Sequence, residues 1–413
     1  MKPASRQLMP FWCFYVHQGM ITALIARGAS AYFRQQGWSL ATLSYLSLAM
    51  LPWVFKGLWA GWAERHALTL RGNRYLGSLA LLQAAMALTL FATGWLTPGD
   101  APLMVVIALL WLATLSATHD IYADGIVIGT TTTASRPAAS IAQVGGSYIG
   151  ILACPPLFLA VAQWGGWTVA LSTLGVVSLL LLYPALRLCQ PLPRSAASLM
   201  KAPAAAAMSP RARWRETWRS LWPGLCLAAV AFPSMRAMMA IEAPILIDLG
   251  MTMSEAGAAL ALYATGGSAL GIVAGGWIAR RVRLATGLQC LLAAHIAIPA
   301  AGCLGYPVLG LPGWITLITL SNVAAAAAFV FVYRLLMDQV RPARPAADYA
   351  LFQSVDAAVA IVMSIGILQL IHHTGYRIAL GLLAVLACAS LLAARRLVQP
   401  LGQPPWLAPW LAP

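Results

Sequence analysis

Asp120 and Asp124 are the acidic side chains whose spacing in this sequence most directly suggests chemistry. Both lie in the apolar run 102–128, and residues four apart on a helix share one face. Two carboxylates that lie close together and are partly removed from water hold a proton more readily than isolated ones. The pair is therefore a candidate proton-coupling site. The alternative is a structural ion pair with Lys56 or Arg136.

Other ionisable residues also lie deep in apolar runs, where a charge is costly. Lys56 is close to the end of its run, so its ammonium could reach the interface, and we expect a gating or packing role. Arg236 lies between Pro233 and Pro244, which can kink a helix, and it is a candidate contact for an anionic ligand. Glu242 is six residues further on, a spacing that argues against a direct pair with Arg236 on one helix.

Arg334 and Asp356 are the remaining deep charges. We expect them either to pair across neighbouring helices or to act in gating or proton coupling.

His17 and Gln18 fall near the middle of the first apolar run. A histidine at that depth either contacts a ligand and relays protons or fills a contact between helices. Tyr148 and Tyr263 complete the candidate substrate contacts, together with Arg236 and Glu242.

The motifs of metal sites and enzymes do not occur in this sequence. The seven cysteines show no Cys-x-x-Cys spacing, and we expect them to be small buried hydrophobes. His-Glu-x-x-His, Gly-x-Ser-x-Gly and the Walker A phosphate loop are also missing. We therefore expect no metal, no cofactor and no enzymatic activity.

The composition indicates the environment that must hold these residues. Of 413 residues, 61% are hydrophobic and 9% are charged, whereas soluble domains carry roughly 25% charged residues. The net charge of +15 does not predict nucleic-acid binding, because the basic residues form short clusters between apolar runs and not one continuous face. The sequence predicts a protein embedded in a lipid bilayer.

Twelve apolar runs are long enough to be membrane-spanning helices. The expected spans are 9–27, 39–60, 75–96, 102–128, 139–162, 167–187, 221–246, 255–279, 284–305, 314–337, 350–371 and 376–394. Twenty of the 26 Lys and Arg residues would then lie on one side, in segments 2–6, 65–74, 136, 187–219, 280–283, 341–344 and 395–396. The positive-inside rule predicts that this side, which holds both termini, is cytoplasmic.

The runs divide into two sets of six. We expect an N-terminal six-helix bundle over 1–187, a cytoplasmic linker over 188–220, a C-terminal bundle over 221–396 and a Pro-rich tail over 397–413. The halves repeat each other: Gly-Trp-x-x-Arg begins at Gly61 and again at Gly276, and Gln143 and Gln353 open corresponding spans. The predicted fold is all-α, with two parallel six-helix repeats. The small-residue patches at 145–150 and 266–271 are expected to pack helices and to form a sliding surface between the halves.

This pattern resembles the major facilitator superfamily over nearly the whole chain. The stretch "LPWVFKGLWAGWAER" (51–65) is similar to muropeptide permeases and acetyl-CoA transporters, and "ATHDIYADGIVIG" (117–129) is similar to the same branch. The Gly after the second Asp and the single set of twelve spans look most like siderophore importers of the FptX/RhtX type. Glu64 stands where the superfamily usually has Asp, His119 where these relatives usually have Gln, and Tyr122 where they have a small residue.

The resemblance implies a monomeric inner-membrane symporter that imports an iron–siderophore complex, ferric pyochelin being the leading candidate, with protons as the coupling ion. The alternatives are a permease for muropeptides or other small molecules, and an efflux transporter for drugs or siderophores.

Overall fold

The computed structural model describes residues 3–38, 45–96, 98–99, 101–132, 134–192 and 210–398. Their regular structure is helical, apart from an isolated bridge between Leu70 and Asn73. The chain forms two compact units: unit 1 contains residues 1–202 and 342–354, and unit 2 contains residues 203–341 and 355–413. Much of the predicted linker, 193–209, and the tail from 399 onward lie outside the described residues.

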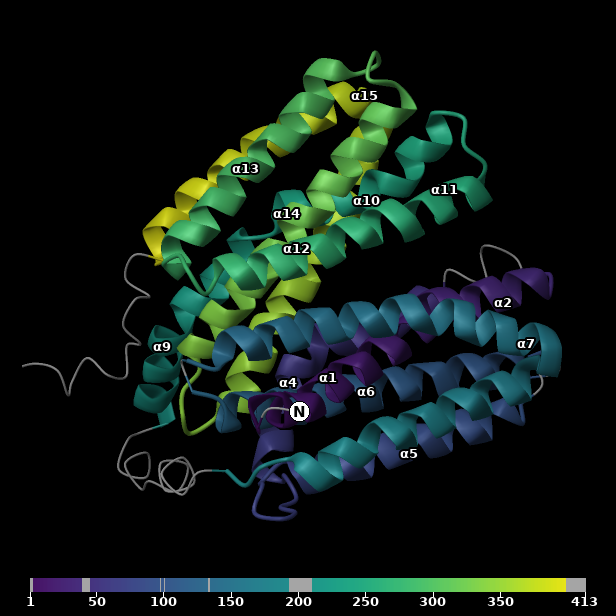
Figure 1. Ribbon diagram of the computed structural model, residues 1–413, viewed down its shortest axis with the longest axis vertical. Helices are drawn as coiled ribbons and strands as arrows, with labels where there is room; N and C mark the ends of the chain where they lie inside the picture. Colours follow the sequence, from purple (N-terminus) through teal and green to yellow (C-terminus); the bar gives the residue numbers. More distant parts are fainter. Residues whose placement is uncertain are drawn as a thin grey trace, which may run out of the picture. The chain divides into compact units, whose positions relative to one another are not determined.

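Unit 1 is a helical bundle in which α1, α5, α6 and α7 run beside one another (Figure 1). Its elements are α1 (Pro3–Ala23), η1 (Leu24–Gly28), α2 (Ala29–Gln35), η2 (Tyr45–Met50), α4 (Leu51–Arg65), α5 (Leu76–Gly94), α6 (Pro102–Thr130) and α7 (Arg136–Leu188). The first turns of α15 (Pro345–Val398) also belong to this unit.

Unit 2 is a second bundle, in which α14 packs against α10, α12 and α13 (Figure 1). Its elements are α9 (Pro210–Val230), α10 (Pro233–Asp248), α11 (Met253–Ala259), η4 (Leu260–Ala264), α12 (Thr265–Ile278), α13 (Leu284–Gly305), α14 (Gly310–Gln339) and the rest of α15. The helix α9 begins at Pro210, inside the segment predicted as linker. The predicted span 221–246 is interrupted before Pro233, because proline lacks the backbone N–H that would continue the helix.

Two helices are much longer than a single crossing of a bilayer requires. The helices α7 and α15 contain 53 and 54 residues, or about 80 Å at 1.5 Å per residue, against a hydrocarbon core of about 30 Å. Each contains one glycine with a non-helical backbone and a positive φ: 76° at Gly166 and 77° at Gly375. These glycines fall in the two gaps predicted between spans 139–162 and 167–187 and between spans 350–371 and 376–394.

Nine helices within the described ranges are long and apolar enough to cross a membrane. They include α7 and α15, each of which contains two helical segments. The helix α4 is shorter, with 15 residues. The all-helical fold is confirmed, and the count of twelve spans stays a prediction.

The small-residue patches pack helices together within each unit. A Cβ on Gly150 of α7 would lie 2.6 Å from the backbone nitrogen of Met20 on α1. A Cβ on Gly267 of α12 would lie 2.6 Å from the carbonyl oxygen of Thr319 on α14. Both glycines therefore allow close contact between helices of their own unit. The expected packing role is confirmed, and the sliding surface between halves stays a prediction.

We predict that Gly267→Ala destabilises the protein by roughly 1–3 kcal/mol, because overpacking forces the two backbones apart. Gly266→Ala is the matched control, since a Cβ there meets nothing within 4 Å. Thermal unfolding in detergent should show a clear drop in Tm for Gly267→Ala and none for Gly266→Ala. Equal Tm values for the two variants would contradict the packing role.

Candidate functional site

The buried ion pair of Lys56 and Asp120 lies at the centre of unit 1. The Lys56 ammonium, on α4, donates to Oδ2 of Asp120 on α6 and to Oε1 of Gln353 on α15. Both charged side chains are 1% exposed. The predicted ion pair of Asp120 is thus confirmed, with Lys56 as its partner.

Asp124 lies one turn further along α6 and bonds to a different set of groups. Its Oδ1 accepts hydrogen bonds from the Tyr15 hydroxyl at 2.6 Å and from Nε2 of Gln143 at 3.1 Å. The Oε1 of Gln143 accepts in turn from the Tyr349 hydroxyl at 2.9 Å. Oδ2 of Asp124 has no hydrogen-bond partner within the described part of the chain. We call these residues the carboxylate cluster: Tyr15, Lys56, Asp120, Asp124, Gln143, Tyr349 and Gln353.

The charges of the carboxylate cluster do not balance when both carboxylates are ionised. Lys56 supplies one positive charge, whereas Asp120 and Asp124 supply two negative charges, and all three side chains are almost fully buried. An uncompensated buried charge is costly. The imbalance favours a proton on one carboxylate. Asp124 is the better candidate, because its bonded partners are neutral and Asp120 is paired with Lys56.

A third buried carboxylate, that of Glu64, holds the first turn of α15. Glu64, on α4, accepts hydrogen bonds from the backbone nitrogens of Ala346 at 3.2 Å and Ala347 at 3.1 Å, and from the Tyr75 hydroxyl at 2.6 Å. A carboxylate at a helix N-terminus satisfies free N–H groups and complements the helix dipole. Glu64 therefore anchors α15 within unit 1.

Unit 2 contains an arginine site bordered by aromatic rings. Arg236, on α10, donates to both carboxylate oxygens of Asp356 on α15, at 3.3 and 2.6 Å, and the Tyr333 hydroxyl donates to Asp356 at 3.0 Å. The Arg236 guanidinium lies 4.5 Å from the centroid of Phe329 and 5.9 Å from that of Phe232. We call Arg236, Asp356, Tyr333, Phe329 and Phe232 the arginine site.

The predicted pairing of Arg334 with Asp356 is wrong. Asp356 bonds to Arg236 and Tyr333, whereas Nη1 of Arg334 donates to the carbonyl oxygen of Ala279 at 3.0 Å. Tyr333 and Arg334 are consecutive on α14, so their side chains point about 100° apart. Tyr333, and not Arg334, faces Asp356.

The other predicted substrate contacts have separate surroundings within their own units. Glu242 accepts from Nδ2 of Asn322 at 2.6 Å in unit 2, and Gln18 accepts from the Ser147 hydroxyl at 3.2 Å in unit 1. Tyr148 is half-buried on α7, and Tyr263 is 41% exposed on η4. Their substrate roles stay predictions.

His17 lies beside His119 inside unit 1. The two ring centroids are 5.2 Å apart, and both side chains are fully buried. His17 Nε2 lies 2.7 Å from the Ser178 hydroxyl, and His119 Nε2 lies 3.2 Å from Oε1 of Gln83. His17 therefore lies in a contact between α1, α6 and α7, and both of its predicted roles stay predictions.

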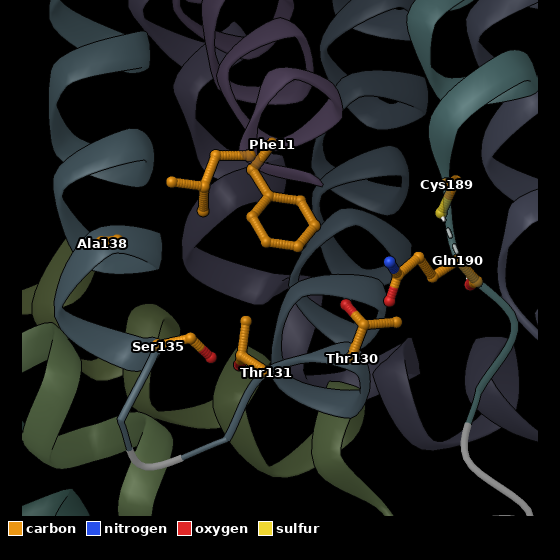
Figure 2. Close-up of a pocket in the computed structure, with 8 residues that line it drawn as sticks. Phe11, Thr130, Thr131, Ser135, Ala138, Cys189 and Gln190 are labelled. Carbon is orange, nitrogen blue, oxygen red and sulfur yellow. Dashed lines mark hydrogen bonds between the residues drawn. The ribbon is translucent and has the colours of Figure 1, made fainter. Parts of the chain in front are cut away.

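A cavity of about 250 Å³ lies among α1, the end of α6, the start of α7 and the segment after α7. Figure 2 shows the Phe11 ring pointing into it, facing Thr130 and Thr131. None of the predicted site residues lines this cavity; its lining residues are Leu8, Phe11, Thr130, Thr131, Ser135, Ala138, Cys189 and Gln190.

The polar groups of this cavity are largely engaged by the chain itself. The hydroxyls of Thr130, Thr131 and Ser135 each donate to a backbone carbonyl one turn away or less. Burial raises the pKa of the Cys189 thiol to about 12, so it stays a neutral thiol and a poor nucleophile near neutral pH.

The sequence did not predict that Tyr15, Tyr349 and Gln143 belong to the carboxylate cluster. It also did not predict that Glu64 binds the first turn of α15. Gln143 and Gln353 had a detectable signal, because they open corresponding spans of the two repeats. Tyr15 and Tyr349 had none, since a tyrosine in an apolar run is indistinguishable by pattern from a packed aromatic residue.

Removing the charge of Asp120 and removing the charge of Asp124 should change the stability of the protein differently. Asp120→Asn leaves Lys56 buried without its counter-ion, and we expect a loss of about 3–5 kcal/mol of stability. Asp124→Asn removes the unbalanced charge while its amide oxygen still accepts from Tyr15, so we expect unchanged or higher stability. Thermal unfolding of both variants tests this difference, and a larger loss for Asp124→Asn would contradict the assigned pairing.

Comparison with known proteins gives a short sequence match. No family model matches this chain. Over 150 residues, or 36% of the chain, it is 28% identical to the anhydromuropeptide permease of Escherichia coli strain K12, and the same figures hold for the permease of Escherichia coli O157:H7. The matched stretch spans 30% of the length of these curated relatives.

Solved structures resemble the chain over nearly its whole length. A bacterial homologue of the iron transporter ferroportin, in an outward-facing state, has a TM-score of 0.68 and 10% identity and covers 97% of this chain and 100% of its own. The major facilitator superfamily transporter FucP, in the outward conformation, has a TM-score of 0.68 and 11% identity and covers 96% of this chain and 99% of its own. At such identities the likeness concerns the fold. The chain is a multi-pass membrane protein with the fold of major facilitator superfamily transporters.

Proposed function

We propose that this chain is a proton-driven secondary transporter of the inner membrane, with both termini in the cytoplasm. It imports a small organic anion, and the leading substrate is a ferric siderophore, ferric pyochelin above all. The observation that carries the proposal is the carboxylate cluster, in which one buried cation faces two buried carboxylates.

Asp124 is the proposed proton carrier. In the closed cluster its charge is unbalanced, so a proton there restores neutrality in a medium that penalises net charge. When the cluster opens to water, an ionised Asp124 is solvated and the proton can leave. The free energy of proton binding to Asp124 therefore differs between the closed and the open cluster, and this difference couples proton binding to the conformational change.

The first turns of α15 are the proposed cytoplasmic gate. They are held within unit 1 by Glu64 at the backbone of Ala346 and Ala347, by Lys56 at Gln353, and by the bond from the Gly57 amide to the Ser354 hydroxyl at 2.9 Å. A cytoplasmic position for this end of the bundle is supported by the basic residues of segment 65–74 under the positive-inside rule. Substrate release would require these bonds to break.

The arginine site is the proposed substrate contact. The Arg236 side chain is 21% exposed although its guanidinium is bonded to Asp356. The buried rings of Phe232 and Phe329 support the guanidinium from behind, and a guanidinium suits a ligand that carries a carboxylate or phenolate oxygen. Ferric siderophores commonly expose such oxygens.

Helix α15 links the two sites through its own backbone. Gln353, which accepts from Lys56, and Asp356, which accepts from Arg236, are three residues apart on one continuous helix. A ligand that draws Arg236 away from Asp356 would therefore act on the same turn of helix that Lys56 holds.

A muropeptide permease is the second candidate function. The sequence match to the anhydromuropeptide permeases supports it, and peptidoglycan fragments also carry carboxylates for Arg236. Siderophore import is supported by the resemblance that rests on Gly125 after the second Asp and on the predicted set of twelve spans. Thermal-shift measurements with ferric pyochelin, other ferric siderophores and an anhydromuropeptide separate the two. Stabilisation by the anhydromuropeptide alone would reject the siderophore proposal.

The role of Arg236 is tested with the double variant Arg236→Gln/Asp356→Asn. The single Arg236→Gln variant leaves Asp356 buried without its cation, whereas the double variant removes both charges and keeps the fold. A lost charged hydrogen bond costs about 1.5–3 kcal/mol, so we expect the Kd of the stabilising ligand to rise roughly 10- to 100-fold. An unchanged Kd in a double variant with wild-type Tm would exclude Arg236 as a substrate contact.

A further inference from the structure

We propose that His17 and His119 form a second proton-binding site in unit 1, distinct from the carboxylate cluster. This inference deepens the proposed proton-driven transport and rests on it. The pair is fully buried and belongs to neither the carboxylate cluster nor the arginine site.

The hydrogen bonds around Gln83 fix the tautomer of His119. The backbone carbonyl of Ser178 can only accept, so the Gln83 side chain that lies 2.8 Å from it donates through Nε2. This orientation places Oε1 of Gln83 toward His119 Nε2, at 3.2 Å. An amide oxygen can only accept, and His119 must therefore carry its hydrogen on Nε2.

A neutral His119 in this tautomer has a bare lone pair on Nδ1. This nitrogen is buried and has no hydrogen-bond partner within the described residues, and the same is true of Nδ1 of His17. The Ser116 hydroxyl, one turn before His119 on α6, is also buried without a partner in that part of the chain. A buried polar atom left unpaired costs about 1–3 kcal/mol. The basic nitrogen of His119 is the group here that can take up a proton.

The spacing of the rings allows one proton and disfavours two. With centroids 5.2 Å apart, two imidazolium rings would repel each other strongly in a buried site. His119 precedes Asp120 directly on α6, and the proposal requires the unbalanced negative charge of the carboxylate cluster to favour a single proton on one of the two rings.

The ionisable groups on the surrounding helices define the electrostatic setting. Gln83 and Ser178, which bond to the pair from α5 and α7, are neutral. The buried and half-buried ionisable side chains on α1, α4, α6 and α7 include Cys13, Tyr15, Lys56, Glu64, Asp120, Tyr122, Asp124, Tyr148 and Cys154. When Lys56, Asp120 and Asp124 are ionised, a proton on the histidine pair balances the net negative charge of these three side chains. Asp124 and the pair thus compete for one proton.

The matched variant is His119→Gln. Glutamine can donate from its amide nitrogen to Oε1 of Gln83, so the variant keeps this hydrogen bond and removes the titrating nitrogen. His17→Gln is the corresponding change on α1. In reconstituted vesicles we expect His119→Gln to keep substrate exchange and wild-type Tm. The midpoint of the pH dependence of uptake should move to higher pH, because Asp124 no longer competes with the histidine pair for the proton.

Nitrogen-15 NMR of the histidine rings in lipid nanodiscs gives a readout that needs no transport, with His17→Gln and His119→Gln to assign the signals. At about pH 8 we expect the His119 ring to be neutral with its hydrogen on Nε2, and at about pH 5 we expect one imidazolium in the pair. Two neutral rings at every pH, with uptake still proton-driven, would overturn the histidine site and leave the proposed function intact. Absent uptake with a titrating pair would instead reject the proposed function alone.

Discussion

The burial of Lys56 is the constraint on which the rest of unit 1 depends. An ammonium at 1% exposure must have a counter-ion, and Asp120 provides it. Asp120 can do so because α6 packs against α4 at this point. Because Asp120 neutralises Lys56, the charge of Asp124 has no counter-ion, although Asp120 and Asp124 lie on the same face of α6. The tyrosine hydroxyls and the amide around it, from Tyr15, Tyr349 and Gln143, orient this second carboxylate without neutralising it.

Both units contain a buried histidine and serine that join helices through hydrogen bonds, with different partners in each unit. In unit 1 a buried histidine on α1 bonds to Ser178 on the last segment of the bundle, and Gln83 on α5 bonds to the backbone of the same serine. In unit 2 Ser234 on α10 bonds to His295 on α13 and to the backbone of Leu383. In each unit three helical segments are thus joined by a histidine, a hydroxyl and a backbone carbonyl. This agreement supports the repeat that the sequence suggests, and it explains how polar residues persist inside bundles this apolar.

Much of the fold could be predicted because it follows from length and hydrophobicity. The glycines at 166 and 375 fall in gaps that the apolar runs already marked. The pairing of polar residues was harder to predict. The shared face of Asp120 and Asp124 follows from helical spacing, but the choice of Arg236 over Arg334 as partner of Asp356 depends on how α10, α14 and α15 are rotated about their own axes. Hydrophobic periodicity is weak in a helix that is apolar all round, so the sequence pattern does not predict how these helices are rotated.

The central claim is that Asp124 carries the proton that drives accumulation, and vesicles loaded with substrate test it most directly. Two fluxes are compared for wild type and for Asp124→Asn: exchange of labelled for unlabelled substrate, and net uptake driven by an imposed inward proton gradient. The account predicts that the variant exchanges substrate at a rate close to that of wild type and does not accumulate it. Wild-type accumulation by Asp124→Asn would contradict the account.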